Sequence, residues 1–256
     1  PFLVHCRTVM YCHEPPVRLY WDQVMPHVIK AYEDSGRTSF KDFVSGMEKR
    51  GEKRGKKRLG HDRKLDQSSV QGLDLVLANS QFTADAVERI YQRPSVVCYP
   101  GVTSPKPKQQ RSSSPFIAWI SSTAPHKNAK LFLAGVKAVL ENDPERAKEL
   151  RVRASGINNA PFKSLIGSLG LENTVHLESW LTDDQLADMI SDAAFVAYPN
   201  LDEPFGLVPI EAMARSKAVL TANIGGPSET NIHNSTGLCV DVTSIAELAQ
   251  GIASLW

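Results

Sequence analysis

The stretch AFVAYPNLDEPFGLVPIEAMARSKAVLTANIGGPSE, residues 194–229, decides the fold. It opens on the apolar run Ala194–Tyr198, which predicts a buried strand, and helical spacing follows over Val208–Arg215. A second apolar run, Ala218–Ala222, predicts another strand, so the three elements form a parallel βαβ unit. Ligands of such sheets bind beyond the carboxyl ends of the strands. Functional side chains are therefore expected in the loop that joins the first strand to the helix.

The same alternation extends in both directions from this stretch. After residue 115 we expect further strands over Phe116–Ser121, Arg151–Ser155, Val175–Leu177 and Leu238–Val240, and helices over Lys127–Asn142, Pro161–Leu169, Thr182–Asp192 and Ser244–Trp256. Nearer the start, buried strands are expected over Leu3–Cys12, Leu73–Ala78 and Val96–Tyr99, with a helix over Gln81–Gln92 that Ser80 caps. The expected fold class is α/β, with parallel sheets covered by helices on both faces.

A segment rich in Pro and Ser divides the chain unequally. Residues 103–114 lack apolar periodicity and predict an interdomain linker. Residues 1–102 are then a partial N-terminal domain and residues 115–256 a nearly complete C-terminal one. The chain also lacks an initiator Met, so a truncated first domain is expected.

Composition excludes several classes of protein. Hydrophobic residues make up 42% of the chain and charged residues 22%, which is typical of a globular protein. The net charge of +1 predicts no general attraction to nucleic acid. No apolar run approaches the ~18 residues that span a membrane, and four scattered cysteines do not make a disulfide framework. A reducing, cytoplasmic setting is expected.

The charge balance hides one basic segment, Lys49–Lys64, in which nine of sixteen residues are Lys or Arg. No aromatic residue interleaves these cations, so no stacking platform for nucleic acid is present. Gly46 precedes this segment and Gly51, Gly55 and Gly60 interrupt it, which predicts a mobile connection. The remaining alternatives are a solvated loop and contact with an anionic membrane surface, at ~1 kcal/mol per cation.

The loop after Tyr198 has the features of an anion site flanked by acids. Pro209 suits the first turn of a helix, so the N–H groups of Gly206 and its two successors point out of the helix start. That arrangement favours an anion such as phosphate. Glu203 and Glu211 stand eight residues apart beside it. A carboxylate near phosphate is favourable when it accepts hydrogen bonds from hydroxyls, and vicinal sugar hydroxyls suit that role.

The segment EPFGLVPIEAMA resembles the E-x7-E donor site of the GT-B glycosyltransferases similar to glycogen synthase, a large retaining family with two Rossmann-like domains. GGPSE (Gly225–Glu229), STGLCVD (Ser235–Asp241) and APHKN (Ala124–Asn128) match that family in order and spacing. The resemblance covers residues 115–256 and is weaker before them. It implies a GT-B type fold with two Rossmann-like parallel-sheet domains, the first incomplete.

The resemblance also implies roles for individual residues. Glu203 would contact the transferred sugar, Glu211 the ribose hydroxyls, and Lys127 the diphosphate leaving group. The turn that meets sugar and diphosphate would comprise Phe205, Gly206, Leu207 and Val208. One departure is Ser122, which stands where the family carries an Arg that binds phosphate. His13 follows an apolar strand of the first domain, where the family has a histidine that faces the sugar.

The function that the resemblance implies is transfer of a sugar, with retention of anomeric configuration, from a nucleotide-sugar donor to an acceptor hydroxyl. No metal and no cofactor beyond the donor are expected. The acceptor class stays open between lipid-linked and polysaccharide hydroxyls, and the protein would be cytoplasmic or peripheral at the inner membrane face. The alternative is a catalytically weak or inactive nucleotide-sugar binding module, because of Ser122 and the short first domain.

Overall fold

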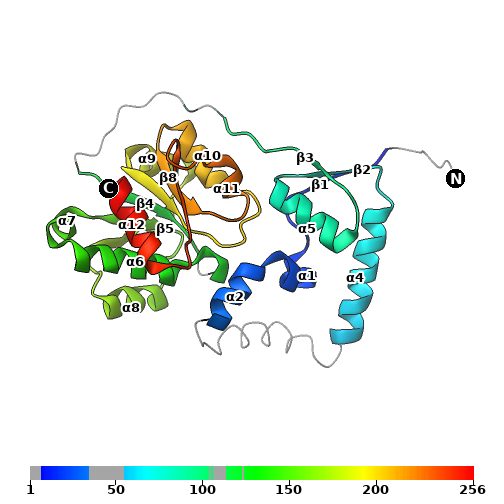
Figure 1. Ribbon diagram of the computed structural model, residues 1–256, viewed down its shortest axis with the longest axis horizontal. Coiled ribbons are helices and arrows are strands. Elements are labelled where there is room, and N and C mark those ends of the chain that lie inside the picture. The colour runs from blue at the N-terminus through cyan, green and yellow to red at the C-terminus, as the bar shows by residue number, and fades with distance from the viewer. Residues whose placement is uncertain (1–6, 35–54, 104, 106–113, 123) are drawn as a thin grey trace. The chain divides into compact units, whose positions relative to one another are not determined.

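A computed structural model describes residues 7–34, 55–103, 105, 114–122 and 124–256 of the chain. The fold is α/β and divides into two compact units, Pro1–Pro100 and Gly101–Trp256 (Figure 1). Each unit contains one parallel sheet, of three strands in the first and six in the second. The expected fold class, with two parallel-sheet domains, is confirmed.

The first unit has the strand order β1-β2-β3. Its elements are β1 (Val9–Cys12), α1 (Val17–Val24), α2 (Pro26–Asp34), α4 (Gly55–Gln71), β2 (Leu75–Ala78), α5 (Gln81–Tyr91) and β3 (Val96–Val97). Its core joins Cys12 and Val76 from the sheet to Tyr20, Val70 and Ile90 from the helices. As expected, the Ser80 hydroxyl caps α5, accepting a hydrogen bond from the Thr83 N–H at 2.9 Å.

The expectation that these three strands are buried is wrong for one face of the sheet. The register places Val9 opposite Leu75 and Leu77 opposite Val96, so alternate residues share a face. On that face Val9, Leu75 and Val96 are 38–56% exposed. The other face carries Val76 and Ala78, which the helices of this unit bury. Runs of apolar residues predict strands that are buried on both faces of the sheet. Within the described part of this unit, helices cover one of the two faces.

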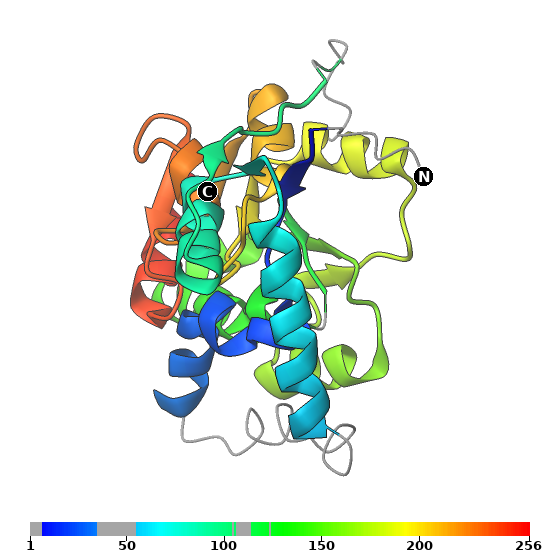
Figure 2. The same cartoon turned by 90° about the vertical axis from the view of Figure 1, so that its right-hand side faces the viewer.

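The basic segment is also partly corrected. Lys49–Arg54 lie outside the described residues, but from Gly55 onward the chain is helical and forms α4, the long cyan helix of Figure 2. Val70 and Leu59 join α4 to the core of this unit, and polar side chains add further contacts. The Gln67 amide donates to the Ile90 carbonyl at 3.2 Å, and the Arg63 guanidinium donates to the Leu19 carbonyl. The glycines predict a mobile connection, and from Gly55 onward that prediction is wrong, because these contacts hold a helix in place.

The second unit has the strand order β6-β5-β4-β7-β8-β9. Its strands are β4 (Ile117–Ile120), β5 (Val152–Ser155), β6 (Val175–Leu177), β7 (Phe195–Tyr198), β8 (Ala218–Ala222) and β9 (Gly237–Val240). Its helices are the 3-10 helix η1 (Pro125–Lys127), α6 (Ala129–Asn142), α7 (Pro144–Glu149), α8 (Ala160–Leu169), α9 (Asp183–Asp192), α10 (Leu207–Ala214), α11 (Pro227–Thr230) and α12 (Ile245–Leu255). Helix α7 was not anticipated, and α6 starts two residues later than expected.

Helices cover both faces of the six-stranded sheet. On one face Ala118 and Val196 pack with Ile190 of α9 and Ala212 of α10. On the other, the Trp119 ring lies 4.6 Å from the ring of Phe132 in α6, and α12 packs along α6. A capping box begins α9: the Thr182 hydroxyl accepts from the Gln185 N–H, and the Gln185 side chain accepts from the Thr182 N–H. No helix in the described ranges is both long and apolar enough to cross a membrane.

A buried amide fixes the end of the sheet that carries the GGPSE segment. Asn231 follows α11 and is 3% exposed. Its Nδ2 donates to the Thr221 hydroxyl at 2.9 Å and to the Val219 and Leu238 carbonyls at 3.3 and 3.2 Å. One side chain therefore ties α11 to both β8 and β9.

We expect Asn231→Ala to lower the free energy of unfolding by roughly 2–4 kcal/mol, because it leaves several buried polar groups without their donor. Chemical denaturation measures this change. Asn173→Ala, at an exposed turn position, is the matched control and should shift stability by less than about 0.5 kcal/mol. Equal effects of the two substitutions would show that the Asn231 hydrogen bonds do not hold this part of the sheet.

Candidate functional site

The strand order of the second unit has its topological switch point between β4 and β7. From β4 the chain builds outward through β5 and β6, and from β7 outward through β8 and β9. The loops that leave β4 and β7 therefore turn to opposite faces, which opens a crevice between them at the carboxyl edge. The Leu201 N–H after β7 donates to the His126 carbonyl after β4 at 2.7 Å. The two loops are thus joined at the crevice.

An ion pair lies at this switch point. The Lys127 ammonium, at the end of η1, is 2.8 Å from Oε2 of Glu203, which follows β7. The side chains are only 20% and 15% exposed. The same ammonium lies 5.5 Å from the centroid of the Tyr198 ring, within cation–π range. Two residues 76 positions apart in sequence are thus brought into contact.

The surroundings of Glu203 keep it ionised. Burial is the largest influence and raises its pKa, but Lys127, then the Asn200 amide and His126, bring the pKa below the ordinary value of a glutamic acid. The Asn200 Nδ2 donates to the same Oε2 at 2.7 Å. Burial, and then the neighbouring Lys127, lower the pKa of His126, so its imidazole is neutral at pH 7. The charged groups at the crevice are therefore Lys127 and Glu203 rather than this histidine, and their two charges cancel.

The turn after Glu203 depends on Gly206. This residue is the N-cap of α10 and has φ +84°, a left-handed conformation that a side chain disfavours. A Cβ there would lie 2.9 Å from Cγ of Pro227 and 3.2 Å from Cε1 of Tyr198. The first amides of α10 have no intrahelical acceptor, as at every helix start. They form a positive end of the helix dipole next to the ion pair.

The loop after β8 packs directly on this turn. The Gly226 N–H donates to the Glu203 carbonyl at 2.8 Å. A Cβ on Gly226 would lie 2.1 Å from the Pro204 carbonyl oxygen, so only glycine fits this approach. The loops that follow β4, β7 and β8 are therefore in contact at one edge of the sheet. The sequence analysis expects the functional side chains at this edge of the sheet.

The other predicted residues of the second unit lie around the same turn. Phe205 is buried, Leu207 is exposed and Val208 is half-buried at the start of α10. Glu211 is half-buried one turn further along the helix. Ser122 follows β4, and its hydroxyl accepts from the Ala124 N–H at 3.3 Å.

His13 belongs to the first unit, where it directly follows β1 and is exposed. Its ring contacts the Tyr11 ring edge-on, with the centroids 4.8 Å apart. Its carbonyl accepts a hydrogen bond from the Thr83 hydroxyl at 3.3 Å. His13 therefore occupies the strand-end position that the sequence predicts, in the unit that does not contain the ion pair.

Sequence reasoning missed three residues of this edge. Tyr198 ends the apolar run Ala194–Tyr198, which predicts a buried strand and no polar contact, and Asn200 lies in the following loop without a motif that marks it. Trp180 lies in the loop after β6 and is 89% exposed. Because β6 is two strands from β4, the ends of these two strands are about 10 Å apart along the edge. An exposed Trp at a strand end was the signal that could have identified it.

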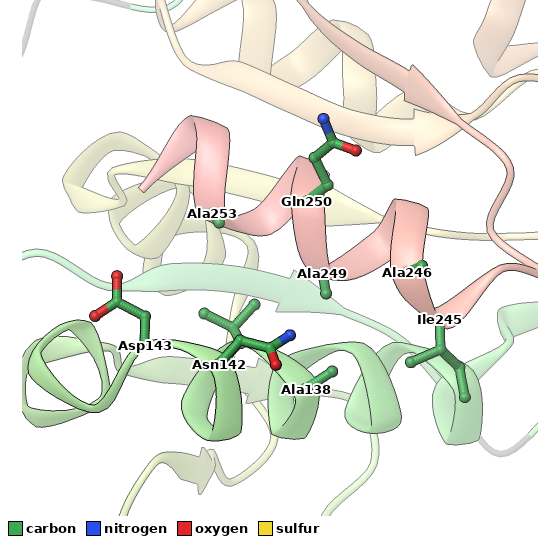
Figure 3. A pocket seen from close by; sticks show the side chains of 9 residues that line it. Ala138, Asn142, Asp143, Ile245, Ala246, Ala249, Gln250 and Ala253 are labelled. Carbon is green, nitrogen blue, oxygen red and sulfur yellow. The ribbon is translucent and has the colours of Figure 1, made fainter.

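Two other properties bear on what the site can hold. In the described part of the chain no three His, Cys, Asp or Glu side chains gather as they would around a metal ion. A separate hollow of about 500 Å³ lies between α6 and α12 (Figure 3). Its lining includes Ala138, Ala246, Ala249 and Ala253, with Asp143 at one end. That groove is apolar with an acidic end, so it suits an anion poorly.

A double-mutant cycle tests the ion pair. We expect Lys127→Met and Glu203→Gln each to destabilise the chain, and the double variant to lose less than their sum, with a coupling of about 1–3 kcal/mol at pH 7. Glu203 has a lowered folded-state pKa, so its contribution is complete above the unfolded value near 4.3 and is lost as the pH falls through the folded value. Thermal denaturation at pH 7 and pH 3 measures both effects. Strict additivity at pH 7 would contradict the pairing.

Comparison with known proteins yields a family and several relatives. Residues 103–256 match the model of the family described as glycosyl transferases group 1. The D-inositol 3-phosphate glycosyltransferase of Corynebacterium glutamicum (strain R) is 30% identical over 145 residues, covering 54% of this chain and 34% of that protein. The MMP alpha-(1->4)-mannosyltransferase of Mycolicibacterium hassiacum is 29% identical over 150 residues, covering 59% and 35%. The chain thus spans about a third of the length of these relatives.

Solved structures share the fold. Sucrose-phosphate synthase from Thermosynechococcus elongatus superposes with a TM-score of 0.64 at 20% identity, over 75% of this chain and 51% of that one. Anabaena HepE in complex with UDP-glucose gives a TM-score of 0.64 at 20% identity, over 76% and 57%. Both alignments cover three quarters of the chain.

Proposed function

The chain belongs to the glycosyl transferases group 1 family, and we propose that it provides the donor site of an enzyme that moves a sugar from a nucleotide sugar to an acceptor hydroxyl. The observation that carries the proposal is the Lys127–Glu203 pair at the switch point of the second sheet, beside the start of α10. The Lys127 ammonium, the amides at the start of α10 and the carboxylates of Glu203 and Glu211 lie at one edge of the sheet. Together these groups suit a ligand that combines phosphates with hydroxyls.

Each residue has a distinct role in this proposal. Lys127 and the amides of Gly206–Val208 bind the diphosphate, and a charge-assisted contact from Lys127 contributes ~1.5–3 kcal/mol. As the bond between sugar and diphosphate breaks, the same groups stabilise the negative charge that builds on the leaving oxygens. Glu203 accepts hydrogen bonds from the sugar, and Glu211 accepts them from the ribose. No side chain needs to form a covalent bond to the sugar.

The stereochemistry and acceptor are further parts of the proposal. Retention of configuration is supported by the E-x7-E spacing shared with the retaining enzymes that the sequence resembles, and the same resemblance supports chemistry without a metal. His13 is proposed to face the sugar from the first domain. The acceptor is a hydroxyl of a lipid-linked sugar, a polysaccharide or, by the name of the Corynebacterium relative, a phosphorylated inositol. NMR of the product anomer tests retention.

A second function rests on Ser122. The phosphate-binding Arg expected at this position is replaced by a hydroxyl that instead accepts from the Ala124 N–H. A hydroxyl does not reproduce the two charge-assisted bonds of a guanidinium. The alternative is therefore a nucleotide-sugar binding module with weak or no turnover. Donor binding without transfer to any of the three acceptor classes supports it, whereas turnover excludes it.

The ribose contact gives the main test of the donor site. We expect Glu211→Ala to weaken binding of a nucleoside diphosphate by ~1–3 kcal/mol, since it removes the acceptor for two hydroxyls. Titration calorimetry with UDP, GDP and ADP measures this. Glu172→Ala removes an equal charge from an exposed position of the same unit, before β6, and should leave affinity unchanged. Equal losses in the two variants would remove Glu211 from the site.

The base is proposed to stack on Trp180. Stacking of a base on an aromatic ring is worth ~1–3 kcal/mol and tolerates any base, and the loop after β6 lies at a suitable distance along the edge. Trp180→Ala should weaken nucleoside diphosphate binding about tenfold, Trp180→Phe should retain most of it, and inorganic diphosphate should bind both variants as it binds the parent chain. A loss that extends to inorganic diphosphate would point to general disruption of the loop.

A further inference from the structure

In the free protein the two charged groups assigned to neighbouring parts of the donor, its diphosphate and its sugar, are bound to each other. The Lys127 ammonium, proposed to bind diphosphate, is 2.8 Å from Oε2 of Glu203, proposed to bind sugar. Both side chains are largely buried, so water screens the pair only weakly. A diphosphate that bound without disturbing this pair would meet a neutralised cation and a nearby carboxylate.

We propose that Lys127 and Glu203 form an exchangeable pair: an entering diphosphate takes the ammonium, and its departure frees Oε2 of Glu203 to accept a hydroxyl of the sugar. This inference rests on the proposed function, and it adds a step to donor binding at the same site. No covalent bond changes, because one ion pair is replaced by another and one hydrogen bond by another.

The structure indicates which partner moves. Glu203 is held through both its side chain and its backbone. The Asn200 amide donates to its Oε2 at 2.7 Å, and the Glu203 carbonyl accepts from the Gly226 N–H at 2.8 Å. The backbone of Gly225 also approaches Glu203 closely, since a Cβ there would lie 2.9 Å from the Glu203 carbonyl oxygen. Lys127 is a compact charge on a flexible four-carbon stem. The carboxylate therefore keeps its place and one donor when the ammonium leaves.

The exchange also gives an order to donor recognition. Oε2 already accepts two hydrogen bonds in the free protein, which occupies the lone pairs available to a third donor. A sugar hydroxyl can therefore donate to Oε2 only after the diphosphate has drawn Lys127 away. A free monosaccharide, which carries no charge to draw the ammonium, should bind this site poorly even at high concentration.

A binding cycle on the intact chain tests the exchange. UDP, GDP and ADP are titrated into the parent chain, and the tightest binder is then titrated into Glu203→Gln, Lys127→Met and the double variant. We expect Glu203→Gln to tighten binding at least tenfold more in the presence of Lys127 than in the Lys127→Met background. The amide removes the competitor for the ammonium, and in the Met background no ammonium is present to be released.

The matched background separates exchange from simple repulsion. Removing a carboxylate charge near a diphosphate strengthens binding in any case, but by the same factor in both backgrounds, so equal factors would overturn the exchange. Glu203→Asp is a second variant that keeps the charge and draws it back by one methylene. If the Lys127–Glu203 pair must be broken, Glu203→Asp should also tighten binding of the nucleoside diphosphate. Unchanged or weaker binding would count against the exchange.

Failure of the proposed function has a different signature. If none of the three nucleoside diphosphates binds the parent chain, the donor site itself is wrong and no exchange can occur. If one of them binds and Glu211→Ala weakens it, while the two Glu203→Gln factors are equal, the site stands and the exchange alone is wrong. Melting temperatures of all four proteins verify that each is folded at the temperature of the titration.

Discussion

The parallel pairing of β4 with β7 is the constraint on which the site depends. Ile117, Ala118 and Trp119 lie opposite Phe195, Val196 and Ala197, all of them inaccessible to solvent. That register sets the level at which both strands end, and the strand order sends their following loops to opposite faces. Lys127 and Glu203 therefore meet because of hydrophobic burial beneath them rather than because of their mutual attraction. A slip of the register would separate them and expose the core together.

The site is maintained by backbone contacts more than by side-chain packing. Gly206 and Gly226 allow the loops after β7 and β8 to approach within distances that any Cβ would prevent. The buried Asn231 amide, which follows α11, binds this helix to β8 and β9 through hydrogen bonds. With the frame held in this way, the Lys127 side chain is the movable charge at the crevice. Such a division suits a site that must hold its acids still while a cation changes partners.

Strong periodicity explains how much of the fold was predictable. The strands and most helices of the second unit follow from apolar runs and caps, and the E-x7-E turn was placed at the right strand end. Three features were not predictable. Lys127 and Glu203 are both expected in the donor site, but the sequence carries no signal that the two side chains bond to each other. Helix α4 contacts the core through only a few apolar residues, among them Val70 and Leu59, and otherwise through polar side chains, so its sequence shows no helical hydrophobic period. The sequence predicts that both faces of the β1–β3 sheet are buried, because the residues of the exposed face are also apolar.

The most direct test of the account is hydrogen exchange of the backbone amides with and without a saturating nucleoside diphosphate. A donor site at the switch point predicts slower exchange in three segments, residues 124–128, 203–208 and 225–229. The bound diphosphate would cover the amides at the start of α10 and the loops packed around them. The groove between α6 and α12 should be unaffected. Protection confined to that groove, or bound nucleotide with no protection of residues 203–208, would contradict a donor site at the switch point of the second sheet.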